Sequence, residues 1–205
     1  MGLSAETLRA ALDELARRDR SIGSELLRVG YPEPRIRDRG FATLLRTIVG
    51  QQVSVAAAAA IWRRIEERAG ADPAPATVIA LDDESLRACG LSRQKALYAR
   101  SLAEHVLSGR LDLGALPADD EEAVARLSAV NGIGRWSAEI YLMFAEGRPD
   151  VWPAGDLAVR EGLGRILALP ARPTEGEVRR LGEAWRPHRT ALAIFTWHAY
   201  ANPAL

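Results

Sequence analysis

Residues 127–138 place a tight glycine turn between two apolar segments, and this feature constrains the fold more than any other part of the chain. The glycines flank Ile133, and glycine adopts turn conformations that other residues resist. The pattern predicts two helices packed across a short turn, although an ordinary helical hairpin has similar spacing. Main-chain N–H groups at the start of the second helix can bind phosphate without a cationic side chain. The residues that define the pattern are Leu127, Val130, Gly132, Ile133, Gly134 and Ala138.

Apolar residues recur at helical spacing along most of the chain. No segment alternates apolar and polar residues for long enough to predict a strand, so we expect an all-α fold. Proline suits the first turn of a helix, and Pro187 is expected to begin the last one. The expected helices are one after Ser4 with Leu8, Leu12 and Leu15 on one face, then 41–49, 53–67, 83–88, 93–107, 119–129, 135–145, 156–168, one starting at Thr174, and 187–200.

Composition gives no support for nucleic-acid binding, because 27 Lys and Arg balance 27 Asp and Glu. Arginines do cluster around residues 35–46 and 179–189, but solvated helix faces often carry such clusters.

The single cysteine, Cys89, excludes an intramolecular disulfide and a four-cysteine iron–sulfur cluster. The spacing of histidines, cysteine and carboxylates does not support a zinc site. No apolar run reaches the roughly 18 residues that a membrane-spanning helix needs. We therefore expect no membrane association and a location in the cytoplasm, with the nucleoid, or in the nucleus of a eukaryote. We also expect a monomer.

A lone carboxylate, Asp156, follows the Gly- and Pro-rich segment 151–155 at the predicted start of a helix. Aspartate is a common helix N-cap, so the simplest interpretation is a capping role. The position also suits a functional anion, because helix N–H groups and the helix dipole favour negative charge there. The local sequence leaves both interpretations open.

Residues 44–57 read Leu-Leu-Arg-Thr-Ile-Val-Gly-Gln-Gln-Val-Ser-Val-Ala-Ala and place Gln51 and Gln52 between two predicted helices. Ser54 precedes the second helix, where it can cap the helix or contact a phosphate. A polar pair that merely joins two helices is the alternative interpretation.

Taken together, the hairpin, the lead-in to Asp156 and the 44–57 segment resemble the helix-hairpin-helix, Gly/Pro-rich, Asp (HhH-GPD) superfamily of DNA glycosylases. The likeness is greatest to the alkylation-damage branch, that of DNA-3-methyladenine glycosylase II, and it spans roughly residues 35–200. It implies a single catalytic core over residues 1–205, without the additional N-terminal β domain of some relatives. The core is expected to have two helical lobes, roughly 35–125 and 126–205 plus the N-terminal helix, with a cleft between them.

The resemblance also implies how such a core binds DNA. A residue of the 44–57 segment enters the minor groove and fills the gap left by an extruded base. That position matches Gln52, where better-known relatives carry an aliphatic residue. The hairpin carbonyls of Val130 and Ile133 are expected to hold Na⁺ or K⁺. The expected DNA-binding residues are Gly132, Ile133, Gly134, Arg135, Ser137, Gln51, Gln52 and Ser54.

The resemblance makes Asp156 the catalytic residue. Its anion would stabilise the oxocarbenium-like sugar that forms when an N-glycosidic bond breaks, or would orient the attacking water. Lyase-competent relatives carry a lysine at the position of Trp136, so no strand cleavage is expected. Aromatic faces suit an alkylated purine, which is positively charged, although each ring could instead be a core residue. The candidates for the base pocket are Trp136, Trp197, Trp152 and Tyr141, with Ile140 at the position of a family pocket tyrosine.

The sequence therefore predicts a monofunctional glycosylase that removes 3-methyladenine and 7-methylguanine from double-stranded DNA and leaves an abasic site. No cofactor and no iron–sulfur cluster are expected. A non-catalytic helical module that binds damaged or abasic DNA is the main alternative. A glycosylase for deaminated or oxidised bases is a third possibility, but the sequence shows no set of pocket donors for it.

Overall fold

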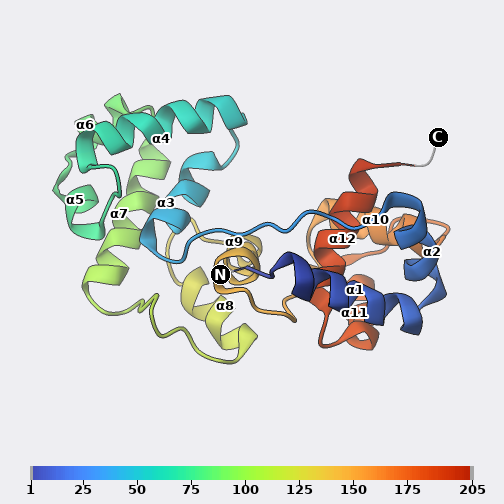
Figure 1. Ribbon diagram of the computed structural model, residues 1–205. Helices are drawn as coiled ribbons and strands as arrows, with labels where there is room; N and C mark the ends of the chain where they lie inside the picture. Colours follow the sequence, from blue (N-terminus) through green and yellow to red (C-terminus); the bar gives the residue numbers. More distant parts are fainter. Residues whose placement is uncertain (1, 204–205) are drawn as a thin grey trace. The chain divides into compact units, whose positions relative to one another are not determined.

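The computed structural model describes residues 2–203, and within this range it contains helices and no strand (Figure 1). The predicted all-α class is confirmed. The chain divides into two compact units, each described by itself below. Unit 1 contains the segments before Asp38 and after Tyr141, and unit 2 contains Asp38–Tyr141.

Unit 2 is built around α3 and α7, and the last helix pair of the unit forms the hairpin. The α3 helix packs on α4, α7 and α9, while α5 and α6 pack on α7 and α8 packs on α9. Leu44, Leu45 and Ile48 of α3 are fully buried in its core. The helices are α3 (Phe41–Gly50), α4 (Val55–Ala69), α5 (Pro75–Ala80), α6 (Asp83–Ala88), α7 (Arg93–Leu107), α8 (Asp120–Ser128) and α9 (Arg135–Tyr141).

Unit 1 combines the N-terminal and C-terminal helices. The α10 helix packs on α12, and α1 packs on α2 and α12. Leu8, Leu12 and Leu15 lie on the buried face of α1, as their spacing predicts. The helical elements are α1 (Ala5–Arg18), α2 (Arg20–Val29), the π-helix η1 (Leu142–Glu146), α10 (Leu157–Ile166), α11 (Glu175–Gly182), the 3₁₀ turn η2 (Glu183–Trp185) and α12 (Arg189–Ala201).

Three differences from the sequence prediction have local causes. The α2 helix follows α1 after a single residue, because the Asp19 side chain accepts the N–H groups of Ser21 and Ile22 and starts a new helix. The α5 helix, with Pro75 in its first turn, is too short to show apolar periodicity. The last helix begins at Arg189 rather than at Pro187, and His188 is its N-cap residue.

The division into units also differs from the predicted lobes. The second boundary follows Tyr141 instead of residue 125, and the first follows Arg37. The reason is that both helices of the hairpin pack within unit 2, α8 against α9 and α9 against α3. The hairpin therefore shares a core with the 44–57 segment.

Candidate functional site

The hairpin turn depends on a glycine in the left-handed conformation. Gly132 has a φ of 90°, and a Cβ atom there would lie 2.3 Å from Cγ of Tyr98. The Ile133 N–H donates to the Val130 carbonyl (3.0 Å) and closes the turn. The Tyr98 ring thus packs directly on the Gly132 main chain, and any side chain at this position would displace it.

The start of α9 presents main-chain donors. The first helical hydrogen bond runs from the Ala138 N–H to the Gly134 carbonyl (3.0 Å), so the preceding N–H groups lack partners within the helix. A Cβ added at Gly134 would meet nothing within 4 Å, so this side of the turn is open to a close approach. The Ser137 side chain is buried, which leaves its N–H as its possible contribution. The predicted turn is confirmed, and its contact with DNA stays a prediction.

Arg135 is held by carboxylates of both hairpin helices. Its guanidinium pairs with Glu121 of α8 and with the buried Glu139 of α9 (3.2 Å). The hydrogen bond to Glu121 raises the pKa of Arg135. The Arg135 side chain therefore joins α8 to α9, and its expected contact with DNA stays a prediction.

The turn between α3 and α4 contains the only non-glycine residue of unit 2, among those that the structure describes, with a positive φ. That residue is Gln52, which is exposed and has a φ of 52°. The Gln51 Nε2 atom donates to the Gly132 carbonyl (2.8 Å), so its amide contacts the hairpin. The Ser54 Oγ atom accepts the Ala57 N–H (3.2 Å), which confirms the capping interpretation of this serine.

Asp156 is the N-cap of α10, and its carboxylate has two identified donors. Oδ1 accepts the Val159 N–H (2.9 Å) and the indole Nε1–H of Trp197 (3.0 Å). The capping prediction is therefore confirmed. The contact with Trp197 goes beyond capping, because it fixes the carboxylate from a second helix, α12.

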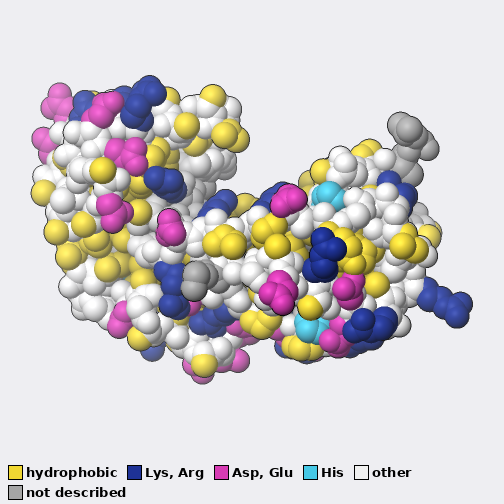
Figure 2. All heavy atoms as spheres, in the orientation of Figure 1, with side chains coloured by type: hydrophobic (Ala, Val, Ile, Leu, Met, Phe, Trp, Pro, Cys, Tyr) yellow, Lys and Arg dark blue, Asp and Glu magenta, His cyan; other side chains and the backbone are white. Residues whose placement is uncertain are grey.

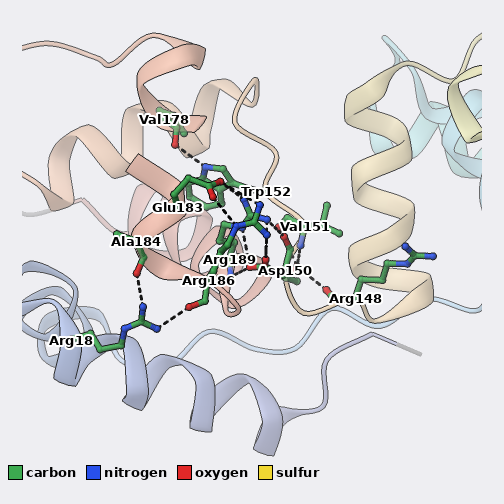
Figure 3. A network of polar contacts seen from close by, with 11 residues as sticks. Arg18, Arg148, Asp150, Val151, Trp152, Val178, Glu183, Ala184, Arg186 and Arg189 are labelled. Atoms are coloured by element: carbon green, nitrogen blue, oxygen red, sulfur yellow. Dashed lines mark hydrogen bonds and ion pairs between the residues drawn. The ribbon is translucent and has the colours of Figure 1, made fainter. Parts of the chain in front are cut away.

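The loop that leads to Asp156 is anchored by a buried ion pair (Figure 3). The Arg189 side chain is 9% exposed and binds both oxygens of Asp150 (2.9 Å each), as well as the Asp150 carbonyl (2.8 Å). Its Nη1 atom also donates to Glu183 (3.1 Å). Arg186 binds the same two carboxylates, and its hydrogen bond lowers the pKa of Glu183. Arg186 and Arg189 therefore form ion pairs within the structure. The interpretation of the 179–189 cluster as a solvated helix face does not hold for Arg189, which is buried.

Thr190, the next residue of α12, forms hydrogen bonds with main-chain groups of the same loop. Its hydroxyl donates to the Arg148 carbonyl (2.7 Å) and accepts the Val151 N–H (3.0 Å). The first turn of α12 therefore fixes the start of the loop, and Trp197 of the same helix fixes the carboxylate at its end.

The four aromatic candidates lie in different environments. Trp136 is 48% exposed on α9. Trp197 is partly exposed and lies near Phe144, with a ring-centroid distance of 5.9 Å. Trp152 and Tyr141, in contrast, are core residues. The Trp152 indole donates to the Val178 carbonyl (2.9 Å), and the Tyr141 hydroxyl accepts the Gly40 N–H (2.9 Å). The structure thus favours a packing role for these two.

Several structural residues of the site have only weak signals in the sequence. The sequence interpretation gave no role to Asp150 or Glu183. Asp150 lies far in the chain from Arg189, the arginine that binds both carboxylates. The contact of Lys95, the only lysine of the chain, with the Val49 carbonyl (2.8 Å from Nζ) has no local sequence signal either, because the two residues lie far apart in the chain.

Side-chain types on one face of the molecule are shown in Figure 2, where acidic and basic groups are interspersed. Among residues 2–203, no helix is long and apolar enough to cross a membrane. The same residues contain no group of three or more His, Cys, Asp or Glu side chains that could hold a metal ion.

Comparison with known proteins identifies the family of the chain. The model of the HhH-GPD superfamily base excision DNA repair proteins matches residues 45–187. DNA-3-methyladenine glycosylase 1 of Schizosaccharomyces pombe is 37% identical over 161 residues, which cover 77% of this chain and 71% of the relative. DNA-3-methyladenine glycosylase 2 of Escherichia coli is 29% identical over 191 residues, which cover 86% and 65%.

A solved structure agrees with these sequence relatives. The S. pombe 3-methyladenine DNA glycosylase Mag1, in complex with abasic DNA, has a TM-score of 0.79 and 33% sequence identity. The superposition covers 92% of this chain and 95% of that one. The chain belongs to the HhH-GPD superfamily of base excision DNA repair proteins.

Proposed function

We propose that the chain is a monofunctional DNA glycosylase that hydrolyses the N-glycosidic bond of alkylated bases in double-stranded DNA. The observation that carries the proposal is Asp156, whose carboxylate is fixed by two N–H donors at the start of α10. The relatives named as DNA-3-methyladenine glycosylases support the substrate class. Every group in the proposal comes from one chain, so we propose that the monomer is active.

In this proposal, unit 2 binds the DNA. The main-chain N–H groups at Gly134 and the start of α9 bind a phosphate through donors and helix dipole. This contact needs no net positive charge, which fits a chain whose net charge is zero. The exposed Gln52 fills the space that the extruded nucleotide leaves, and its amide can bond to the orphaned partner base.

Unit 1 supplies the chemistry. The ionised Asp156 carboxylate stabilises positive charge as it develops on the sugar, and it can also orient the attacking water. An alkylated purine is a cation before the bond breaks, so it leaves without a general acid. Aromatic faces suit such a base, and we assign Trp197, the partly exposed residue that donates to Asp156, to its recognition.

The chain lacks an amine where a lyase would use one. Trp136 occupies the position that carries the Schiff-base lysine in lyase-competent relatives. The only lysine, Lys95, is partly buried and hydrogen-bonded to the Val49 carbonyl. We therefore propose that the reaction stops at the abasic site.

The hairpin also offers oxygen donors for a monovalent cation. Val130 and Ile133 are buried, and hard cations favour main-chain carbonyl oxygens. We propose that these carbonyls would hold Na⁺ or K⁺, which would add positive charge beside a bound phosphate.

The proposal is tested with duplex DNA treated with a methylating agent. After incubation with the protein, free bases are separated by chromatography, and release of 3-methyladenine or 7-methylguanine is expected. Duplexes with one deaminated or oxidised base are treated in parallel and should release little. Borohydride should trap no covalent complex with abasic DNA. Tight binding to abasic DNA with no base released from any duplex would instead establish the non-catalytic module.

A further inference from the structure

The turn that carries Gln52 is tied directly to the phosphate-binding hairpin. The Gln51 side chain donates from Nε2 to the Gly132 carbonyl at 2.8 Å. Gly132 is the residue whose φ of 90° shapes the hairpin turn, and both residues belong to unit 2. One hydrogen bond therefore links the two segments that the proposed function assigns to base extrusion and phosphate binding.

Lys95 contacts the end of α3, which leads into the same turn. Its Nζ atom donates to the Val49 carbonyl (2.8 Å), in the last turn of α3, where carbonyls lack partners within the helix. The ammonium is partly buried, and burial lowers the pKa of Lys95. A compact ammonium with three donors suits this position at a helix end. The end of α3 is therefore held where the Gln51–Gln52 turn begins.

The conformation of Gln52 shows why such support is needed. A φ of 52° is unfavourable for a residue with a side chain, and such conformations persist where the surroundings determine them. Gln51 precedes this position and is extended, with its N–H donating to the Ile48 carbonyl (3.3 Å). Contacts from Gln51 and Lys95 thus constrain the strained residue from the hairpin and from α7.

We propose that Gln51 and Lys95 are positioning residues that couple phosphate binding by the hairpin to insertion of Gln52 into the DNA. The inference rests on the proposed function, because it assigns a common step to two parts of that site. The Gln51 amide then acts within the protein, which differs from the direct DNA contact expected from the sequence. Phosphate binding by the hairpin and insertion of Gln52 then occur together, because the hydrogen bond from Gln51 makes the hairpin and the turn move as one.

The test compares two duplexes with a single 7-methylguanine, one with cytosine opposite and one with an abasic analogue opposite. Extrusion is easier in the second duplex, so a variant with poor insertion is rescued there. Gln51→Met removes the donor and keeps the length of the side chain. Its single-turnover rate should fall about tenfold on the paired duplex and recover on the unpaired one. Lys95→Met should show the same rescue, and Gln94→Met, a change on an exposed part of α7, should resemble the wild type.

A second readout does not depend on base release. The fluorescence of 2-aminopurine next to the lesion reports unstacking, and Gln51→Met should reduce it to the level of Gln52→Ala while affinity for abasic DNA is kept. Equal loss of rate on both duplexes, or no loss on either, would overturn the coupling. A wild type that releases no base would overturn the proposed function instead, and the fluorescence of the variants would still decide the coupling.

Discussion

The hairpin of unit 2 and the Asp156 loop of unit 1 are held in place by different physical means. The hairpin relies on main-chain conformation, with Gly132 in a left-handed turn against Tyr98. The loop relies on charge, with Asp150 and Arg189 paired in a largely buried position. Under the proposed function, the hairpin binds phosphate with main-chain N–H groups and needs no cationic side chain, whereas the loop must hold a carboxylate in a fixed position. The difference predicts that the two regions respond differently to mutation.

Arg189→Met should have the largest effect on stability. It removes the bidentate partner of the mostly buried Asp150 carboxylate and leaves Arg186 as its remaining cation, so the loss should cost about 2–3 kcal/mol. Denaturant unfolding monitored by tryptophan fluorescence measures the loss. Arg179→Met removes an exposed partner of Glu175 and should cost less than about 1 kcal/mol. If both variants unfolded alike, the loop would not depend on the buried pair.

Gly132→Ala should damage unit 2 without any change in charge. The new Cβ atom would collide with Tyr98 in a conformation that costs alanine about 1–2 kcal/mol, so both stability and DNA affinity should fall. Gly134→Ala has open space around it and is the matched control for folding. It should unfold like the wild type but bind DNA more weakly, because its methyl group lies where a phosphate would approach. Normal DNA affinity in both variants would contradict the phosphate-binding role of the turn.

These two regions were not equally predictable from the sequence. The hairpin is encoded locally, since glycines and apolar residues within a short segment determine it, and the predicted turn agrees with the structure. Asp156 was equally visible, because N-cap chemistry is local. The Asp150–Arg189 pair joins residues far apart in the chain, and no short pattern reveals it.

Burial separates the four aromatic candidates for the base pocket. Trp152 and Tyr141 are buried, whereas Trp136 is exposed, and this difference depends on tertiary packing. Sequence spacing alone could not show which ring faces remain accessible.

Trp197→Phe should lower the catalytic rate and have a smaller effect on stability than Arg189→Met or Gly132→Ala. Phenylalanine keeps an aromatic face but removes the indole donor to Asp156. The kcat should fall about tenfold, the worth of one hydrogen bond to a charged group, with little change in KM. Trp62→Phe removes an indole donor to Glu66 in unit 2 and should leave kcat unchanged. A large rise in KM with an unchanged kcat would assign Trp197 to base binding alone.

The most direct test of the proposed mechanism compares wild type with Asp156→Asn for DNA binding and base release from the same methylated duplex. Asparagine is as good an N-cap as aspartate, so the variant should fold and bind abasic DNA like the wild type. Asp82→Asn, the same change at the N-cap of α6, controls for the loss of a capping charge. We predict that base release falls about 100-fold or more in Asp156→Asn alone. Near-normal release by this variant would show that Asp156 is only a helix cap and would contradict the proposed mechanism.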